Sequence, residues 1–172
     1  QQFVYEPDLL QCIGCYTIVL FRVMFPASYL SFSTSSSDDT FPVTIECSDT
    51  VLGVSKEVVS FVLPIGATIN MDGTSLYQAV AAVFIAQAFG MDLDFATQMG
   101  IVATATLASI GSAAVPGAGM VMLIIVLAQA GIPEAGLALI FAVDRPLDMC
   151  RTVINVTGDA MVSLWVNKSQ ED

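Results

Sequence analysis

The hydrophobic residues of this chain fall into four blocks, and polar or helix-breaking residues interrupt every block. The blocks run from about residue 12 to 30, 58 to 89, 95 to 130 and 135 to 166. Blocks of this length and apolar content are typical of segments that lie in a membrane. Unpaired backbone groups are tolerated at that depth only where protein or a cavity surrounds them. We therefore predict an all-α membrane protein whose interruptions mark its functional site.

Two of the blocks predict helical hairpins. Residues 11–55 have an apolar helix, the polar run Ser31–Thr40 and a short second helix that begins at Pro42. Residues 92–131 have two apolar arms joined by the small-residue segment Ser109–Gly119. At ~1.5 Å per residue an arm of about 11 to 15 residues covers roughly 20 Å, less than the ~30 Å hydrocarbon core. This second hairpin is therefore expected to be re-entrant.

The remaining blocks predict one broken and one polar-faced transmembrane helix. In residues 56–90, Pro64, Gly66 and the polar segment Thr68–Thr74 interrupt a stretch that is long enough to span. In residues 134–168, five polar residues recur at spacings of four, three, four and four. At about 100° per residue these spacings place all five within an arc of roughly 80° on one helix. Ionisable groups in such a helix normally line a bundle interior or a solute pathway, so this face predicts a transport site. The five residues are Asp144, Asp148, Arg151, Asn155 and Asp159.

Composition agrees with a membrane protein and excludes two classes of function. Of 172 residues, 55% are hydrophobic and 12% charged, and the mean hydropathy of +0.76 is outside the usual range of a soluble domain. The 5 basic residues against 16 acidic ones form no basic patch for nucleic acid and do not indicate orientation in the membrane. Because the chain has no His, a serine or zinc hydrolase is not expected.

The cysteines favour a packing role, and the N-terminal residues do not resemble a signal peptide. Cys12 and Cys15 have the spacing of a redox or metal motif, but Cys47 and Cys150 are distant in sequence, and small thiols pack readily among apolar helices. The N-terminal residues lack the basic segment of a signal peptide. We expect them to belong to the middle of a longer protein.

Four motifs follow one another along the chain, namely Thr34–Ser37, Gly66–Thr74, Ser109–Gly119 and Asp148–Asp159. Their residues and their order resemble the sodium:dicarboxylate symporter family, which comprises glutamate and aspartate transporters and neutral amino-acid relatives. The resemblance covers about residues 31–166. It implies the C-terminal part of a mobile transport domain, with re-entrant hairpins at 11–55 and 92–131 and without the scaffold domain. It also implies a homotrimer, elevator-like movement, and a multi-pass protein of the plasma membrane, or of the inner membrane in a bacterium.

Arg151 is the candidate for substrate selection. A guanidinium offers a bidentate fork for a carboxylate, and the resemblance implies that Arg151 receives the side-chain carboxylate of an acidic substrate. The alternative is a structural ion pair with Asp148, three residues earlier. The resemblance further implies that Asp148, with Thr152, accepts the substrate amino group and that Asn155 holds the α-carboxylate. It places four more residues at the substrate: Ser36, Ser37, Thr74 and Gly119.

Asp72 and Asp159 are hard oxygen donors beside interrupted backbone, which suits Na⁺ better than softer ligands would. A proton relay or a helix–helix hydrogen bond is the alternative role for such an acid. The resemblance completes the cation sites with these residues: Gly66, Thr68, Asn70, Ser109, Ile110, Ser112 and Asn155.

The sequence therefore predicts a sodium-coupled symporter of an acidic amino acid or C4 dicarboxylate, and not an enzyme. A neutral amino-acid symporter is the alternative that Arg151 argues against, and a channel-like or structural membrane subunit is another. Three departures from the family pattern are Asp38, Ala114 and Arg145-Pro146. An ionised Asp38 near the substrate carboxylate is expected to repel it, and Pro146 is expected to disturb the last helix.

Overall fold

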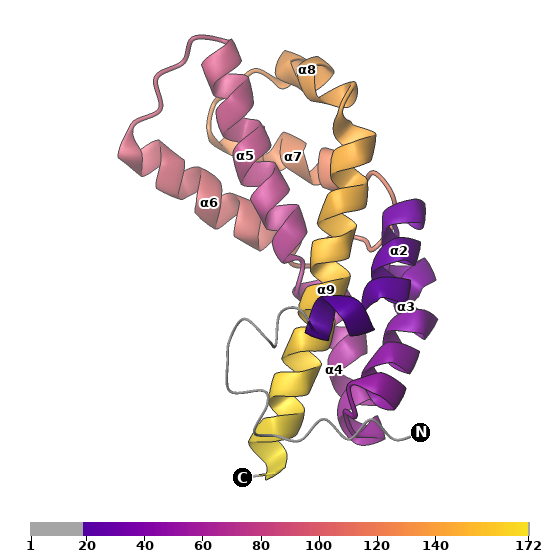
Figure 1. Cartoon of the computed structure of the whole chain (residues 1–172). Coiled ribbons are helices and arrows are strands. Elements are labelled where there is room, and N and C mark those ends of the chain that lie inside the picture. Colours follow the sequence, from indigo (N-terminus) through magenta and orange to yellow (C-terminus); the bar gives the residue numbers. More distant parts are fainter. Residues whose placement is uncertain (1–18, 172) are drawn as a thin grey trace.

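The computed structural model describes residues 19–171, and all secondary structure in this range is helical (Figure 1). This confirms the prediction of an all-α protein. Residues 11–18 of the first predicted hairpin, including Cys12 and Cys15, lie outside the described residues. After a short helical stretch at 19–23, the elements are α2 (Phe25–Thr34), α3 (Ser37–Glu46), the π-helical turn η2 (Cys47–Val51), α4 (Lys56–Ile69), α5 (Asp72–Ala88), α6 (Phe95–Ser109), α7 (Ala118–Gln129), the 3₁₀ turn η3 (Glu134–Gly136), α8 (Leu137–Phe141) and α9 (Asp144–Glu171).

The long helix α9 is the element against which most of the other helices pack. It contacts α2, α3, α4, α5 and α8. Figure 1 shows α5 to α8 around its N-terminal half and α2 to α4 around its C-terminal half.

The prediction of one helix over residues 134–168 is wrong at its start. Residues 134–141 form η3 and α8, and a turn at Ala142 and Val143 separates them from α9. Pro146 lies in the first turn of α9, where the missing N–H of proline leaves no helical hydrogen bond unmade. The expected disturbance of the helix by Pro146 therefore does not occur.

Within residues 19–171, no helix combines the length and the apolar composition that a single membrane crossing requires. Two segments were expected to be transmembrane, 56–90 as a broken helix and 134–168 as the last membrane helix. The first is divided into α4 and α5. In the segment 134–168, the charged residues from Asp144 onward lie on α9, and the most apolar residues lie before it in η3 and α8.

The helices α2 and α3 are joined by a turn of two residues. Ser35 has a left-handed conformation (φ 56°) that ends α2. Ser36 begins α3 because its side chain accepts a hydrogen bond from Asp39 N, and Asp38 and Asp39 in the first turn suit the helix dipole. The polar run 31–40 is therefore mostly helical, and Pro42 lies inside α3 rather than at its start.

The segment 56–90 is broken within its polar part. Pro64 lies inside α4, which continues to Ile69. The break is at Asn70 and Met71, whose ψ angles of 68° and 57° are not helical. Two backbone groups beside the break are paired outside these helices, because Gly73 N donates to Asn155 Oδ1 and Thr68 O accepts from Gly111 N.

The helices α6 and α7 are joined by a loop at residues 110–117. Gly117, with φ 80°, precedes α7, and this left-handed conformation favours glycine. Both helices pack on α5, where they form the largest apolar core with α8. Fully buried members of this core include Ile85, Ile101, Leu123 and Leu127. The core holds the 110–117 loop over the polar face of α9.

Candidate functional site

A small polar pocket lies where the α2–α3 turn, the α4–α5 break and the 110–117 loop meet α9. Its volume is about 10 Å³, which is room for about one water molecule. Five of the predicted substrate residues line it: Ser37, Thr74, Arg151, Thr152 and Asn155. The other lining residues are Ser35, Met71, Ser112, Ala113, Ala114 and Val115. The fold therefore brings together groups from four separate segments of the sequence.

Arg151 is buried on the pocket wall, with 6% of its surface exposed. Its Nη2 lies 2.6 Å from Asp148 Oδ1, so the ion pair of the alternative interpretation is present. The guanidinium also lies over the ring of Tyr77, 5.3 Å from its centroid. Nη1 has no hydrogen-bond partner among the described residues. Because a guanidinium has five N–H donors, Arg151 retains donors for a further anion.

Gly119 of α7 lies directly against this guanidinium. A Cβ atom at position 119 would overlap Arg151 Nη1. The close approach of the α7 backbone to Arg151 therefore depends on glycine at position 119.

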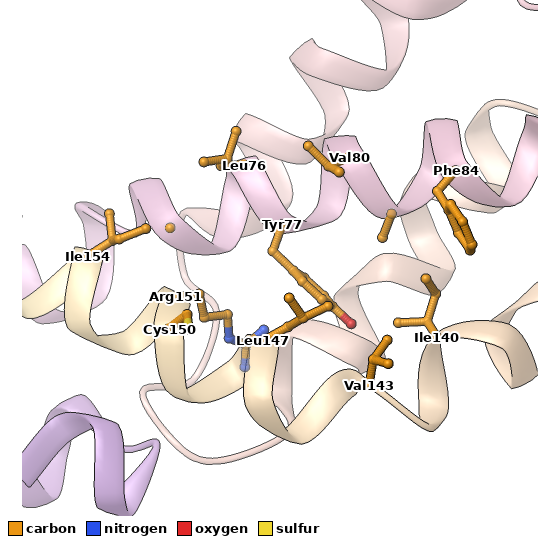
Figure 2. A pocket seen from close by; sticks show the side chains of 12 residues that line it. Leu76, Tyr77, Val80, Phe84, Ile140, Val143, Leu147, Cys150, Arg151 and Ile154 are labelled. Carbon is orange, nitrogen blue, oxygen red and sulfur yellow. The ribbon is translucent and has the colours of Figure 1, made fainter.

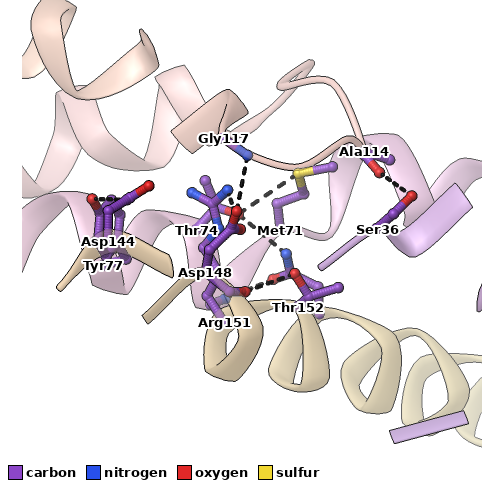
Figure 3. A network of polar contacts seen from close by, with 12 residues as sticks. Ser36, Met71, Thr74, Tyr77, Ala114, Gly117, Asp144, Asp148, Arg151 and Thr152 are labelled. Atoms are coloured by element: carbon purple, nitrogen blue, oxygen red, sulfur yellow. Dashed lines mark hydrogen bonds and ion pairs between the residues drawn. The ribbon is translucent and has the colours of Figure 1, made fainter. Parts of the chain in front are cut away.

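Asp148 joins α9 to the 110–117 loop (Figure 3). Its Oδ2 accepts a hydrogen bond from Gly117 N at 2.8 Å, while its Oδ1 pairs with Arg151. Asp148 is 1% exposed. The loop thus occupies one oxygen of the carboxylate that was predicted to meet a substrate amino group.

Asn155 links α9 to the start of α5. Its Oδ1 accepts from Gly73 N at 2.8 Å, and its Nδ2 donates to Thr74 Oγ1 at 3.1 Å. Thr74 in turn donates to Met71 Sδ at 3.8 Å. An amide nitrogen has two N–H donors, so Asn155 retains one for a ligand in the pocket.

The α2–α3 turn and the 110–117 loop are bonded to each other through Ala114. Ser36 Oγ donates to Ala114 O at 3.2 Å, and Asp38 N donates to the same carbonyl at 3.5 Å. Ser36 is thus beside the pocket without lining it. The side chain of Asp38 is exposed and does not line the pocket.

Asp159 forms a second polar group one turn further along α9, against the end of α4. Asn70 Nδ2 donates to Asp159 Oδ1 at 3.0 Å, and a Cβ at Gly66 would overlap the same carboxylate. Asp159 is 4% exposed. Three predicted cation ligands, one of them a buried carboxylate, are therefore in contact beside the helix break.

The remaining predicted cation ligands are more dispersed. The Thr68 carbonyl accepts from Gly111 N at 3.0 Å, which ties the end of α4 to the 110–117 loop. Asp72 and Ile110 are exposed, Ser109 is buried at the end of α6, and Ser112 lines the polar pocket. Among residues 19–171, no three His, Cys, Asp or Glu side chains form a group that could hold a metal ion. A cation here would depend on one carboxylate and on neutral oxygens.

Three residues of this network were not predicted as site residues. Ser35 lines the pocket beside the predicted serines, and Met71 lines it at the α4–α5 break. Tyr77 supports Arg151 and donates from its hydroxyl to Asp144 Oδ1 at 2.7 Å (Figure 3). The sequence feature that could have identified Tyr77 as a site residue is its position three residues after Thr74, which places both on the same face of α5.

Comparison with known proteins gives one family. The model of the "Sodium:dicarboxylate symporter family" matches residues 4–169. An excitatory amino acid transporter of Onchocerca volvulus is 53% identical over 143 residues, which are 83% of this chain and 29% of that protein. Human excitatory amino acid transporter 5 is 49% identical over 85% of the chain and 26% of its own length. Mouse excitatory amino acid transporter 3 is 54% identical over 78% of the chain and 26% of its own length. The chain thus spans little more than a quarter of the length of the curated relatives it matches.

Proposed function

Because the chain belongs to the sodium:dicarboxylate symporter family, we propose that it is the substrate- and sodium-binding part of a symporter for an acidic amino acid or C4 dicarboxylate. The family and the relatives are membrane transporters and not enzymes. The names of the relatives support an acidic amino acid as the substrate. The observation that carries the proposal is the buried Arg151, which lines the polar pocket and whose Nη1 has no hydrogen-bond partner among the described residues.

In this proposal, Arg151 binds the side-chain carboxylate of the substrate. Hydrogen bonds from a guanidinium to a carboxylate are shorter and stronger than hydrogen bonds between neutral groups, and Arg can make two of them in parallel. Asp148 binds the substrate ammonium group, and the second N–H of the Asn155 amide binds the α-carboxylate. Ser36 and Ser37 add donors from the α2–α3 turn, and Thr74 and Thr152 add hydroxyl groups.

The present pocket of about 10 Å³ is far too small for an amino acid, so we propose that the 110–117 loop is the gate. Opening separates Gly117 N from Asp148 and the Ala114 carbonyl from Ser36. The substrate ammonium then replaces the Gly117 N–H at Asp148. Through this exchange, buried Asp148 would have a partner both in the closed pocket and with substrate bound.

We propose that Na⁺ is co-transported and binds beside the α4–α5 break. Asp159 supplies the charged oxygen, Asn70 supplies its side-chain oxygen after rotation, and Gly66 supplies its carbonyl. Further oxygens would come from Thr68, Asp72, Ser109, Ile110, Ser112 and Asn155. Carboxylate oxygens together with neutral oxygens suit a hard cation such as Na⁺.

We also propose how the segments of the chain are arranged in the membrane. We infer that residues 11–55 and 92–131 are re-entrant hairpins, that 56–90 is a broken transmembrane helix and that 134–168 contains the last membrane-crossing segment. The complete protein would then be a multi-pass homotrimer of the plasma membrane with a separate scaffold domain.

Uptake of labelled aspartate by vesicles containing the full-length protein tests this function. Uptake is expected to require a Na⁺ gradient and to be reduced by unlabelled glutamate or succinate but not by alanine. Uptake that is equal with K⁺ in place of Na⁺, or that alanine inhibits as well as glutamate, would contradict the proposal.

A further inference from the structure

Asp144 is the one member of the five-residue polar face of α9 to which the proposed function gives no role. Its Oδ1 accepts a hydrogen bond from the Tyr77 hydroxyl at 2.7 Å. The guanidinium carbon of Arg151 lies 5.3 Å from the centroid of the Tyr77 ring. Asp144 is therefore linked through Tyr77 to the residue that is proposed to bind the substrate side chain (Figure 3).

The start of α9 fixes the place of Asp144. Asp144 is the first residue of this helix, and Pro146 lies in the same first turn, where its fixed φ suits a helix start. Asp144 and Arg151 are seven residues apart, which is about two turns, so they lie on the same face. An arginine side chain on a helix leans toward the N-terminus, which here is the end that carries Asp144.

Tyr77 reaches α9 from the neighbouring helix. Figure 2 shows its side chain extending from α5 to α9, beside Arg151, at the wall of a cavity of about 410 Å³ between the two helices. Tyr77 and Arg151 are only 8% and 6% exposed. The described residues alone produce this burial, so the contacts of Tyr77 with Asp144 and Arg151 do not depend on what covers the cavity in the full-length protein.

The hydroxyl bond determines where the Tyr77 ring lies. The ring turns about two side-chain torsions, and a bond from its far end to another helix removes this freedom. A hydrogen bond to a carboxylate is also stronger than one between neutral groups. The ring in turn restrains Arg151, because a guanidinium is attracted to the face of an aromatic ring. Without this restraint the long arginine side chain has many rotamers, and binding a substrate carboxylate must fix one of them.

The alternative role for Asp144 is local to α9. A carboxylate in the first turn of a helix is stabilising because of the helix dipole. This role requires the charge of Asp144 but not the Tyr77 hydroxyl. Asp144→Asn removes the charge and retains an acceptor oxygen, whereas Asp144→Leu removes both, so the two substitutions separate the roles.

We propose that Asp144 is a positioning residue, which fixes the Tyr77 ring so that the ring holds the Arg151 guanidinium ready for the side-chain carboxylate of an acidic substrate. Asp144 does not line the polar pocket, so it acts through Tyr77 and not on the substrate. The contacts thereby favour acidic over neutral substrates. This effect on substrate choice rests on the proposed function, whereas the restraint of the guanidinium does not.

Na⁺-dependent binding of labelled aspartate to the full-length protein tests this chain of contacts. Tyr77→Phe and Asp144→Leu are each expected to weaken binding by about five- to tenfold. The double variant is expected to lose at most about twofold more than either single variant, because all three lack the same hydrogen bond. Asp144→Asn is expected to lose at most about threefold. Tyr29→Phe on α2, which lines neither cavity, is the matched control and is expected to change affinity by less than about twofold.

Two results of this comparison would overturn the proposal. Losses that add up in the double variant would show that Tyr77 and Asp144 act separately. Equal losses in Asp144→Asn and Asp144→Leu would indicate the role at the helix dipole instead.

Competition by unlabelled serine measures substrate choice. Serine has no side-chain carboxylate, so its affinity is expected to change by less than about twofold in Tyr77→Phe. A parallel loss of aspartate and serine affinity would overturn the link to Arg151, because it would show general damage to the pocket.

Modification of arginine by phenylglyoxal examines the guanidinium without substrate. Mass spectrometry of the full-length protein measures the modified fraction of Arg151 relative to that of Arg22, which lies outside α9 in the helical stretch 19–23. Arg151 is expected to react at least about threefold faster in Tyr77→Phe and Asp144→Leu than in wild type. Equal reactivity in all three proteins would overturn the proposal. A wild-type protein that binds no aspartate would instead contradict the proposed function, and the modification of Arg151 would still decide whether Asp144 and Tyr77 restrain the guanidinium.

Discussion

The carboxylate of Asp148 accepts a hydrogen bond from the backbone N–H of Gly117 at 2.8 Å. This bond joins the polar face of α9 to the loop between α6 and α7. In the proposed function it keeps the pocket closed and also occupies the carboxylate that a substrate ammonium group requires. Substrate entry and loop opening are therefore one exchange of partners at Asp148.

Arg151→Cys is expected to weaken aspartate binding by about 10- to 100-fold, because hydrogen bonds to charged groups contribute about 1.5–3 kcal/mol. Binding of labelled aspartate to the full-length protein measures this change. Arg145→Cys is the matched control, since Arg145 is exposed on the same helix and lines neither cavity.

The substitution of Arg151 also leaves buried Asp148 without its ion-pair partner, which reduces stability by itself. Thermal unfolding and binding of labelled serine separate the two effects. We expect a folded Arg151→Cys protein that binds serine better than wild type does. Aspartate affinity equal to wild type would show that Arg151 and Asp148 form only a structural pair.

Asp159→Asn is expected to raise the Na⁺ concentration needed for half-maximal aspartate binding by about tenfold or more, because the one buried carboxylate beside the helix break loses its charge. The comparison is with Asp72→Asn, whose side chain is exposed, and for which a smaller shift is expected. Na⁺ titration of aspartate binding measures both. A wild-type Na⁺ requirement in Asp159→Asn would show that the contact of Asp159 with Asn70 and Gly66 has only a structural role.

Gly119→Ala is expected to reduce aspartate affinity by about tenfold or more, because the added Cβ overlaps the Arg151 guanidinium and must displace it. The matched change is Gly100→Ala in α6. There the added Cβ would lie 3.2 Å from the flexible end of Gln129, and alanine favours the helix by about 1 kcal/mol over glycine. Isothermal titration with aspartate compares the variants. A normal affinity in Gly119→Ala would show that α7 is not held against Arg151.

Asp38→Ser is expected to change aspartate affinity by less than about twofold, because solvent and salt screen an exposed carboxylate. The sequence suggests the opposite, since a charge at ~6 Å in an effective dielectric near 20 repels by roughly 3 kcal/mol. The exposed side chain of Asp38, outside the pocket lining, removes the basis of that expectation. Affinities measured at low and high salt test it, and a tightening of tenfold at low salt would place Asp38 beside the substrate after all.

The sequence by itself determined the features that depend on local periodicity and backbone chemistry. The helical repeat of about 3.6 residues already assigned Asp148, Arg151, Asn155 and Asp159 to one face, and all four are buried on α9. The polar segment 68–74 contains the break at Asn70 and Met71, and the small residues before Gly119 form the loop between α6 and α7. The polar run 31–40 also indicated the connection between the first two helices. In the structure that connection is a turn of two residues, because the Ser36 side chain begins α3.

Only the tertiary structure decided which of these local features meet. No spacing indicates that Gly117 N reaches Asp148, that Ser36 reaches Ala114, or that Tyr77 lies beneath Arg151. Two aspartates with the same predicted role also differ, because Asp159 is buried against α4 while Asp72 is exposed at the start of α5. Helix period and capping act over a few residues, whereas these contacts join segments 30 or more positions apart through the packing of whole helices. The register of that packing is set by side chains that meet across the core. It therefore cannot be predicted from the residue order within one helix.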